Sequence, residues 1–193
     1  MDSLDEVTDR LQTLRDLVRF GTTTFNAQGL FFGHGTDNAA DEALALIAHA
    51  LDLTPDQAVQ FPDARLTRSE IAAVYALFHQ RVETRKPAAY LTHEAWFAGR
   101  AYYVDERVLV PRSPIAELIE SGFAPWLDAD GVHRVLDLCC GSGCIGIACA
   151  HALPDITVDL VDCNAGALEV ARINVERHGI QERVRVVESD LYT

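Results

Sequence analysis

The stretch of this sequence with the clearest chemical potential is residues 134–146, Arg-Val-Leu-Asp-Leu-Cys-Cys-Gly-Ser-Gly-Cys-Ile-Gly. Its pattern predicts an apolar strand that ends at an acid, Asp137, then a turn containing Gly141 and Gly143, and a helix from about Ile145. Glycines in such a turn let the backbone approach a small molecule closely, and the unpaired N–H groups at a helix start can bind an anion. The stretch therefore predicts a loop that cradles a small ligand.

Two further acids follow the next two predicted strands. Asp162 comes directly after the strand expected over 157–161, nineteen residues after Gly143, which is the spacing of an acid that binds a ribose. Asp190, followed by Leu191, comes after the third predicted strand and is placed to bind an adenine. Together with the glycine turn, these acids indicate a cofactor that contains a nucleoside.

Two cofactor classes are compatible with this pattern. Residues 141–146 satisfy the G-x-G-x-x-G fingerprint of nicotinamide dehydrogenases, although that pattern alone is weak. A pyrophosphate would be repelled by a carboxylate at the position of Asp137, whereas a sulfonium or ammonium group would be attracted to it. S-adenosylmethionine fits all three acids, with its cationic centre near Asp137, its ribose on Asp162 and its adenine near Asp190. We therefore expect S-adenosylmethionine and keep a nicotinamide-dependent dehydrogenase as the alternative.

Composition narrows the choice of partner and compartment. The 193 residues carry a formal net charge of −13 and an isoelectric point near 4.8, which argues against binding a nucleic-acid backbone and would suit a basic protein partner. The chain starts with an acidic, amphipathic segment rather than a secretory signal, and its most apolar stretch, 135–153, is interrupted by Asp137 and three glycines, so no membrane span is expected. Five cysteines cluster around the loop without metal-ligand spacing. We expect them to be reduced, buried thiols in the cytoplasm, and we expect no metal site.

The sequence predicts a small helical domain over residues 1–85. Apolar residues at helical spacing over 4–18 predict one amphipathic helix that ends near Gly21. A second helix is expected from about residue 40 to residue 51, and a third begins after the capping box of Thr67. These helices would form a domain that precedes the ligand loop.

Residues 86–112 predict a linker built on a β-hairpin. Residues 95–97 and 101–104 have the alternating pattern of two short strands around a turn, and 107–110 could add a third extended piece. The linker would connect the helical domain to a region with a different architecture.

Residues 113–193 predict an α/β region. A helix is expected from Ser113 to about Trp126, with Pro114 at its first position. The strands and helices expected after it alternate, over 134–138, 145–153, 157–161, 165–178 and 184–187. This alternation is typical of a parallel sheet, and three short strands with two crossovers leave such a sheet incomplete.

Several motifs resemble one enzyme family. Residues 137–145 resemble the first motif of class I methyltransferases, with Cys139 where most members carry glycine. Residues 33–38, 89–92 and 103–115, the last containing Val-Pro-Arg-Ser-Pro, resemble the HemK-like protein-(glutamine-N5) methyltransferases. The resemblance covers essentially all 193 residues and is closest to the members that modify the third large-subunit ribosomal protein. The release-factor glutamine methyltransferases share the architecture and are an alternative.

The resemblance implies a fold, a cofactor and a reaction. The fold would be an incomplete Rossmann-like class I methyltransferase sheet over 113–193, preceded by a small helical domain for substrate recognition over 1–85 and a β-hairpin linker. The reaction would transfer a methyl group from S-adenosylmethionine to a glutamine side-chain amide of a large-subunit ribosomal protein. Arg112 is a candidate to orient a carboxylate of the substrate or cofactor. The residues expected to bind the cofactor are Asp137, Cys139, Cys140, Gly141, Ser142, Gly143, Asp162, Asp190 and Leu191.

One part of the family pattern is absent from this sequence. The catalytic Asn-Pro-Pro-Tyr motif of the family follows the fourth strand, and no Asn-Pro-Pro occurs among the 193 residues. In that motif the Asn side chain and a proline carbonyl would accept the N–H hydrogens of the target amide and align its nitrogen with the methyl group. We therefore expect a chain truncated before its catalytic motif, to which no catalytic residue is assigned. A non-catalytic adaptor is a further alternative.

Overall fold

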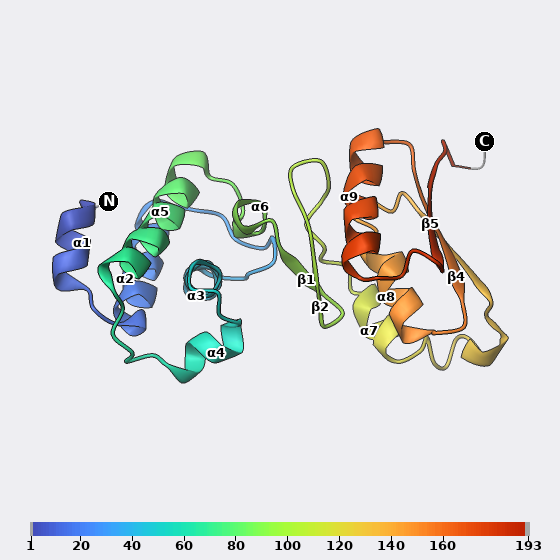
Figure 1. The fold of residues 1–193 in the computed structure, drawn as a ribbon, viewed down its shortest axis with the longest axis horizontal. Coiled ribbons are helices and arrows are strands. Elements are labelled where there is room, and N and C mark those ends of the chain that lie inside the picture. The colour runs from blue at the N-terminus through green and yellow to red at the C-terminus, as the bar shows by residue number, and fades with distance from the viewer. Residues whose placement is uncertain (1, 192–193) are drawn as a thin grey trace. The chain divides into compact units, whose positions relative to one another are not determined.

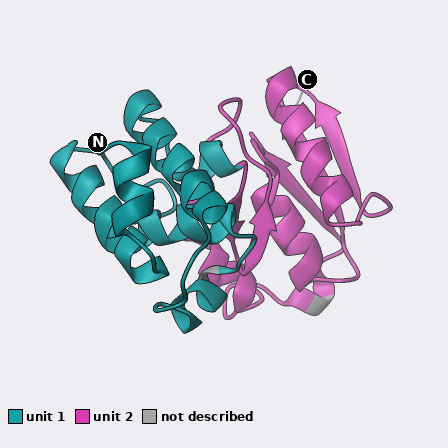
Figure 2. Ribbon diagram, turned by 60° about the vertical axis from the view of Figure 1, so that its left-hand side comes forward, with its two compact units in different colours: residues 1–92 teal, residues 93–193 magenta. Residues whose placement is uncertain are grey.

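The structure is a computed structural model that describes residues 2–191, and it divides into two compact units. Unit 1 is Met1–Thr92 and unit 2 is His93–Thr193 (Figure 2). Unit 1 is built from helices, whereas unit 2 contains a β-hairpin and a parallel sheet with its helices (Figure 1). The predicted fold class, an incomplete Rossmann-like sheet preceded by helices and a hairpin, is confirmed. The domain boundaries expected at residues 85 and 112 stay predictions.

The helices of unit 1 begin at side-chain caps. Their bounds are α1 (Leu4–Arg10), α2 (Leu14–Ala27), α3 (Ala39–Ala50), α4 (Pro55–Gln60), α5 (Arg68–Thr84) and α6 (Ala88–Thr92). Asn38 caps α3 by accepting hydrogen bonds from two backbone N–H groups, and Thr67 with Glu70 forms a complete capping box at α5. These caps confirm the predicted starts of α3 and α5, whereas α4 and α6 were not predicted.

The single helix predicted over 4–18 is wrong, because the chain breaks there into α1 and α2. Thr13 and Asp16 form a capping box that starts a new helix at Leu14. The predicted end near Gly21 is also wrong, since α2 continues to Ala27. A Cβ atom at residue 21 would lie 2.7 Å from the Phe78 ring, so this glycine allows close packing of α2 on α5 rather than ending the helix.

The core of unit 1 contains a buried ion pair next to its aromatic side chains. Phe25 and Phe78 meet edge to face with ring centroids 5.1 Å apart. Arg81 of α5, only 1% exposed, donates from Nε to Oε1 of Glu42 on α3 at 2.6 Å. Its Nη2 donates to the backbone carbonyl of Phe31 at 2.9 Å. Arg81 therefore joins α5 both to α3 and to the loop that precedes α3.

Unit 2 starts with a hairpin and continues as alternating strands and helices. Its elements are β1 (Ala95–Phe97), β2 (Arg100–Tyr102), α7 (Ile115–Glu120), a 3₁₀ turn η1 (Ala129–Gly131), β3 (Arg134–Leu138), α8 (Cys144–Ala152), β4 (Thr157–Asp162), α9 (Ala165–Arg177) and β5 (Val184–Glu188). The hairpin pairs Ala95 with Tyr102 in antiparallel register. These bounds confirm the predicted hairpin and the predicted strands and helices after residue 133 to within a residue or two.

Two expectations for unit 2 are wrong. Residues 107–110, all of them described, have turn and irregular backbone in place of a third extended strand. The helix expected to reach Trp126 ends at Glu120, because Gly122 and Phe123 both adopt a φ of +62° and so leave the helical conformation.

The three later strands form one parallel sheet in the order β3-β4-β5. The crossover helices α8 and α9 share a hydrophobic core with the sheet, in which Val158 and Leu160 of β4 are buried. Side chains alternate along β3, so Asp137 is buried while its neighbour Leu136 is 51% exposed on the opposite face. One face of the sheet thus carries the core.

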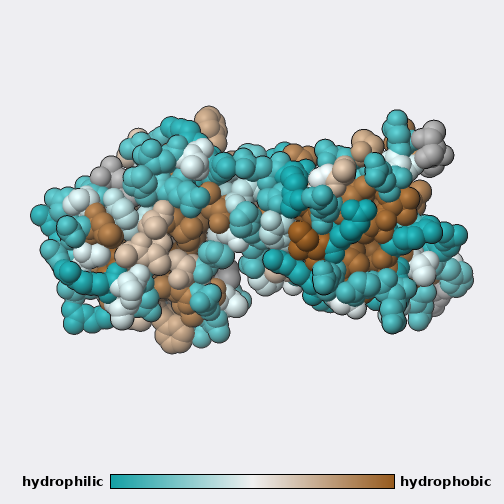
Figure 3. Space-filling view, turned by 45° about the horizontal axis from the view of Figure 1, so that its top comes forward, coloured by the Kyte–Doolittle hydropathy of each residue, from teal (hydrophilic) through white to brown (hydrophobic). Residues whose placement is uncertain are grey.

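Hydrophobic side chains also reach the surface of both units, in patches surrounded by hydrophilic residues (Figure 3). Among the most exposed are Phe31, Leu109 and Trp126. Within residues 2–191, none of the helices is both long enough and apolar enough to cross a bilayer.

The Arg81–Glu42 pair yields a stability prediction. Replacing Arg81 with Met should lower the free energy of unfolding by about 3–5 kcal/mol, because it leaves the Glu42 carboxylate buried without its partner. The control is Arg15→Met, which breaks the ion pair between Arg15 and Asp63, whose side chains are 67% and 73% exposed. This substitution should lower the free energy of unfolding by less than about 1 kcal/mol. Urea unfolding followed by far-UV circular dichroism measures both. Equal losses in the two variants would contradict the buried pair's role.

Candidate functional site

The predicted ligand loop forms the floor of a pocket at the carboxyl ends of β3 and β4. The pocket has a volume of about 440 Å³, within the range typical of small-molecule sites. Its lining comes from two segments far apart in sequence and from the start of α9: residues 107–113, residues 139–142 with 144 and 145, and Asp162, Asn164 and Ala167. A ligand crevice at the carboxyl ends of parallel strands is the usual position in open α/β sheets.

The backbone of the loop turns sharply at three residues with positive φ. Cys139 has a φ of +59°, Gly141 of +54° and Gly143 of +76°. The turn is tied down by the N–H of Cys140, which donates to the carbonyl of Val161 on β4 at 3.0 Å, and by the N–H of Gly143, which donates to the Cys140 carbonyl at 2.8 Å. Glycine adopts this conformation without strain, whereas Cys139 adopts it with a side chain.

Asp137 lies beneath this loop rather than among the residues that line the pocket. Its Oδ2 accepts a hydrogen bond from the N–H of Gly146 at 2.9 Å, in the first turn of α8. A Cβ atom at residue 146 would lie 2.3 Å from Cδ2 of Leu160 and 3.1 Å from the carboxylate, so only glycine fits. Burial raises the pKa of Asp137, the Gly146 hydrogen bond opposes that shift, and the nearby charge of Asp162 adds to it. The carboxylate therefore fixes the start of α8 and adds negative charge below the pocket.

Asp162 lies at the pocket and is oriented by two backbone N–H groups. Its Oδ2 accepts from Gly141 at 3.0 Å, and its Oδ1 accepts from Asn164 at 2.9 Å. Asn164 in turn caps α9, accepting from the N–H groups of Gly166 and Ala167. Each carboxylate oxygen retains capacity for a further hydrogen bond, so Asp162 could accept from ligand hydroxyl groups.

The opposite wall of the pocket is built by residues 107–113. Arg107 donates to both carboxylate oxygens of Asp105 and reaches Oε2 of Glu169 on α9 at 2.6 Å. The side-chain hydrogen bonds from Arg107 hold the pKa of Asp105 well below its usual range. Arg112 also lines the pocket. The ion pairs of Arg107 therefore fix the wall in which Arg112 lies.

Asn174 of α9, which the sequence analysis missed, joins the wall segment to the loop. Its side chain is fully buried, and its Oδ1 accepts from the N–H of Tyr103 at 2.6 Å. Its Nδ2 donates to the carbonyls of Tyr103 and Ser142, each at 2.9 Å. An amide among the apolar positions of the predicted helix 165–178 was the signal that could have revealed it.

The five cysteines separate into two groups. Cys140, Cys144 and Cys149 are buried, as expected, whereas Cys139 and Cys163 are exposed, which corrects the expectation that all five are buried. Burial raises the pKa of Cys140 to about 12 and the pKa values of Cys144 and Cys149 to about 11. The three buried thiols therefore stay protonated at neutral pH and act as small core residues.

The predicted site residues fall into three positions. Those that line the pocket are Arg112, Cys139, Cys140, Gly141, Ser142 and Asp162. Asp137 and Gly143 lie under the loop and at the start of α8, and Asp190 and Leu191 follow β5. Leu191 has a φ of +61° and is 55% exposed. Their roles in binding a cofactor stay predictions.

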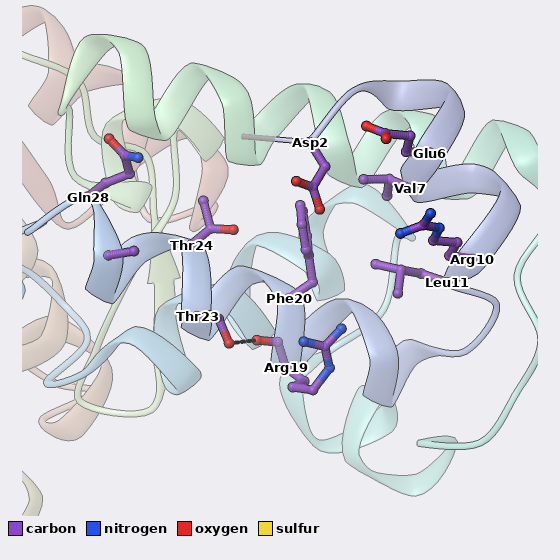
Figure 4. Close-up of a pocket in the computed structure, with 11 residues that line it drawn as sticks. Asp2, Glu6, Val7, Arg10, Leu11, Arg19, Phe20, Thr23, Thr24 and Gln28 are labelled. Atoms are coloured by element: carbon purple, nitrogen blue, oxygen red, sulfur yellow. Dashed lines mark hydrogen bonds between the residues drawn. The ribbon is translucent and has the colours of Figure 1, made fainter.

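Unit 1 has a pocket of its own, of about 370 Å³, between α1 and α2 (Figure 4). Asp2, Glu6, Arg10 and Arg19 give it charges of both signs, around the ring of Phe20. Its described lining residues include no glycine and no strand end. The pocket in unit 2 is therefore the better candidate for a nucleoside cofactor.

Comparisons with known proteins place both units near methyltransferases. The Methyltransferase small domain model matches residues 122–193, and the PrmC N-terminal domain model matches residues 26–92. The Ribosomal protein uL3 glutamine methyltransferase of Neisseria meningitidis serogroup B is 49% identical over 189 residues, covering 97% of this chain and 62% of that protein. The protein of the same description from Xanthomonas campestris pv. campestris is 53% identical over 186 residues, covering 96% and 60%.

The chain matches only part of the length of each of these relatives. The chain spans between 59% and 63% of the length of the curated relatives that it matches.

Among solved structures, the N-terminal domain of human METTL16 in complex with SAH aligns at 19% identity and a TM-score of 0.38, over 48% of this chain and 37% of that chain.

We predict that Asn174 is essential for stability. Replacing it with Ala should lower the free energy of unfolding by at least about 2 kcal/mol, because each buried backbone group left unpaired costs about 1–3 kcal/mol. The control is Glu176→Ala, an exposed position on the same helix, which should cost less than about 0.5 kcal/mol. Thermal and urea unfolding measure both. A loss at Asn174 no larger than at Glu176 would contradict the network.

We predict a pH dependence from Asp137. Because its pKa is raised in the folded chain, the folded state binds the proton more tightly, so the contribution of Asp137 to stability falls as pH rises through that pKa. Asp137→Asn should therefore be more stable than the unsubstituted chain at neutral pH, and this difference should shrink as the pH falls toward the ordinary aspartate value of about 3.9. Melting temperatures across this range test it. Asp155→Asn, at an exposed aspartate of the same unit, is the matched control for the substitution itself.

Proposed function

We propose that this chain, which belongs with the uL3 glutamine methyltransferases to the HemK-like methyltransferase family, binds S-adenosylmethionine in the pocket of unit 2. We further propose that the protein methylates a glutamine side-chain amide of ribosomal protein uL3 in the cytoplasm. The observation that carries the proposal is Asp162 beside a glycine loop, in a chain 49% identical to a uL3 glutamine methyltransferase over 97% of its length. The chain spans about three fifths of the length of such relatives, so the methyltransferase activity of the whole protein is part of the proposal.

The residues around the pocket fit this cofactor in shape and in charge. Gly141 lines the pocket, and because it has no side chain the space beside its backbone stays open at the pocket floor. Two carboxylates, Asp162 at the pocket and Asp137 below it, make the loop side of the site negative. That charge favours a ligand with a cationic group over one with a pyrophosphate.

Each residue of the pocket then has a definite task. When bound, S-adenosylmethionine supplies an electrophilic methyl group on a sulfonium. Asp162, already oriented by two N–H groups, would hold the ribose hydroxyls. Arg112 would orient a carboxylate by charge-assisted hydrogen bonds. Asp137 would keep the loop and the first turn of α8 in place while its charge favours the cation.

The nicotinamide alternative is supported by the glycine pattern alone. The same loop satisfies G-x-G-x-x-G, but Asp137 beneath it would oppose a pyrophosphate. Direct competition between the two cofactors therefore separates the two hypotheses.

We predict that Asp162→Ala weakens binding of S-adenosylmethionine at least about tenfold, because a hydrogen bond to a charged group contributes about 1.5–3 kcal/mol. Isothermal titration calorimetry on the 193-residue chain measures the dissociation constant. The matched control is Asp159→Ala on the same strand, where the carboxylate pairs with Arg134 and Arg185, and its dissociation constant should stay within about twofold of the parent.

Three results would count against the proposal. Unchanged affinity in Asp162→Ala would remove the assigned ribose ligand. Equal losses in the two variants would indicate a general effect on the fold. Saturable binding of NADH with no binding of S-adenosylmethionine would make the protein a candidate dehydrogenase.

A further inference from the structure

The loop between α2 and α3 exposes a large aromatic side chain on a fixed backbone. We call residues 30–36, Leu-Phe-Phe-Gly-His-Gly-Thr, the aromatic loop. Phe31 is 87% exposed, the largest exposed fraction among the large hydrophobic residues described. A phenylalanine so placed contributes nothing to the core of unit 1, so its position requires another explanation.

The backbone around this loop is held by two arginines of the same helix end. Arg81 donates from Nη2 to the carbonyl of Phe31 at 2.9 Å. Arg85 donates from Nη2 to the carbonyl of Gln28 at 2.9 Å and from Nη1 to that of Gly29 at 3.4 Å. The chain entering the loop is therefore fixed on both sides of Leu30.

The Arg81 contact is backed by a buried network. Glu42 accepts from Arg81 at one carboxylate oxygen and from the hydroxyl of Thr36, the last residue of the loop, at the other, at 3.0 Å. Within the loop the N–H of Gly33 donates to the carbonyl of Thr36 at 2.6 Å. Burying a charged pair is costly, and here the pair orders both the start and the end of a surface loop.

We propose that the aromatic loop is a preformed docking element for a basic protein, and that Phe31 is the residue which inserts into that partner. The inference rests on the proposed function, which supplies the partner as the protein substrate uL3. An aromatic side chain on a rigid backbone loses little conformational freedom on binding, which is why such residues dominate binding energy at interfaces.

Charge complementarity selects a basic protein among the possible partners. Residues 1–92 contain 13 acidic and 8 basic side chains, and the exposed Asp37 and Asp41 follow the loop directly. Exposed acids close in sequence to an exposed phenylalanine fit a partner with an apolar pocket rimmed by Lys or Arg. The same acids would repel an anionic membrane surface, and a second copy of this acidic chain would be repelled as well.

The test measures binding of the chain to purified uL3 from the same organism by biolayer interferometry. Phe31→Ala should weaken the affinity at least about tenfold, while Phe31→Leu, which keeps an apolar side chain, should retain most of it. Asp37→Asn with Asp41→Asn should slow association and reduce its dependence on salt. Calorimetry with S-adenosylmethionine should give the same dissociation constant in all variants, because the cofactor pocket lies in unit 2.

Phe61→Ala is the matched control, because Phe61 is also an exposed phenylalanine of unit 1, at 53%, and lies outside the loop. It should bind uL3 within about twofold of the parent chain. Similar melting temperatures for Phe31→Ala and Phe61→Ala would exclude unfolding as the cause of any loss.

The possible failures are distinguishable. If the parent chain binds uL3 and Phe31→Ala binds equally well, the docking role is wrong and the proposed function stands. If the parent chain binds S-adenosylmethionine but not uL3, the proposed substrate is wrong and the inference is overturned with it. If sedimentation shows a dimer of the parent chain that Phe31→Ala dissociates, the loop binds a second copy, which also overturns the proposal.

Discussion

The candidate site depends on how closely α8 approaches the sheet. At residue 146 there is no room for a side chain, because a Cβ atom would lie 2.3 Å from Leu160 of β4. This contact fixes the first turn of α8 in register with the strand ends, and the hydrogen bond from Gly146 to Asp137 fastens it. The turn through residues 139–143 must then span a short distance, which accounts for its three residues with positive φ. The shape of the pocket floor follows from that contact.

The pocket also requires that its two sides keep their spacing, and α9 provides this. Asn174 binds Ser142 on the loop and Tyr103 on the segment leading to the wall, both through one buried amide. Four residues from the start of the same helix, Glu169 pairs with Arg107 at the exposed edge of the wall. Because the buried amide is rigid and the ion pair is partly solvated, we expect Asn174 to set the spacing and Glu169 to contribute less.

Local patterns were enough to predict much of this fold. The strand that ends at Asp137, the glycine turn and the strand that precedes Asp162 have signals within a few residues, and the structure has them there. The break between α1 and α2 was missed because the apolar spacing continues across it, while the capping box at Thr13 decides the outcome. Asn174 and Arg81 were missed for another reason. The partners of Asn174 lie 32 and 71 residues away in the sequence, and those of Arg81 lie 39 and 50 residues away. Only the tertiary fold brings them together.

Two buried carboxylates, Glu42 and Asp137, differ in the charges that surround them. Glu42 is 1% exposed and faces the Arg81 guanidinium at 2.6 Å, so its charge is balanced inside unit 1. Asp137 is 9% exposed, and its burial raises its pKa, while the Gly146 N–H opposes that shift and the charge of Asp162 adds to it. Ionising Asp137 therefore costs free energy in the folded chain. A cationic ligand in the pocket above it would relieve that cost, and this gain is the physical reason to expect a sulfonium cofactor at this loop.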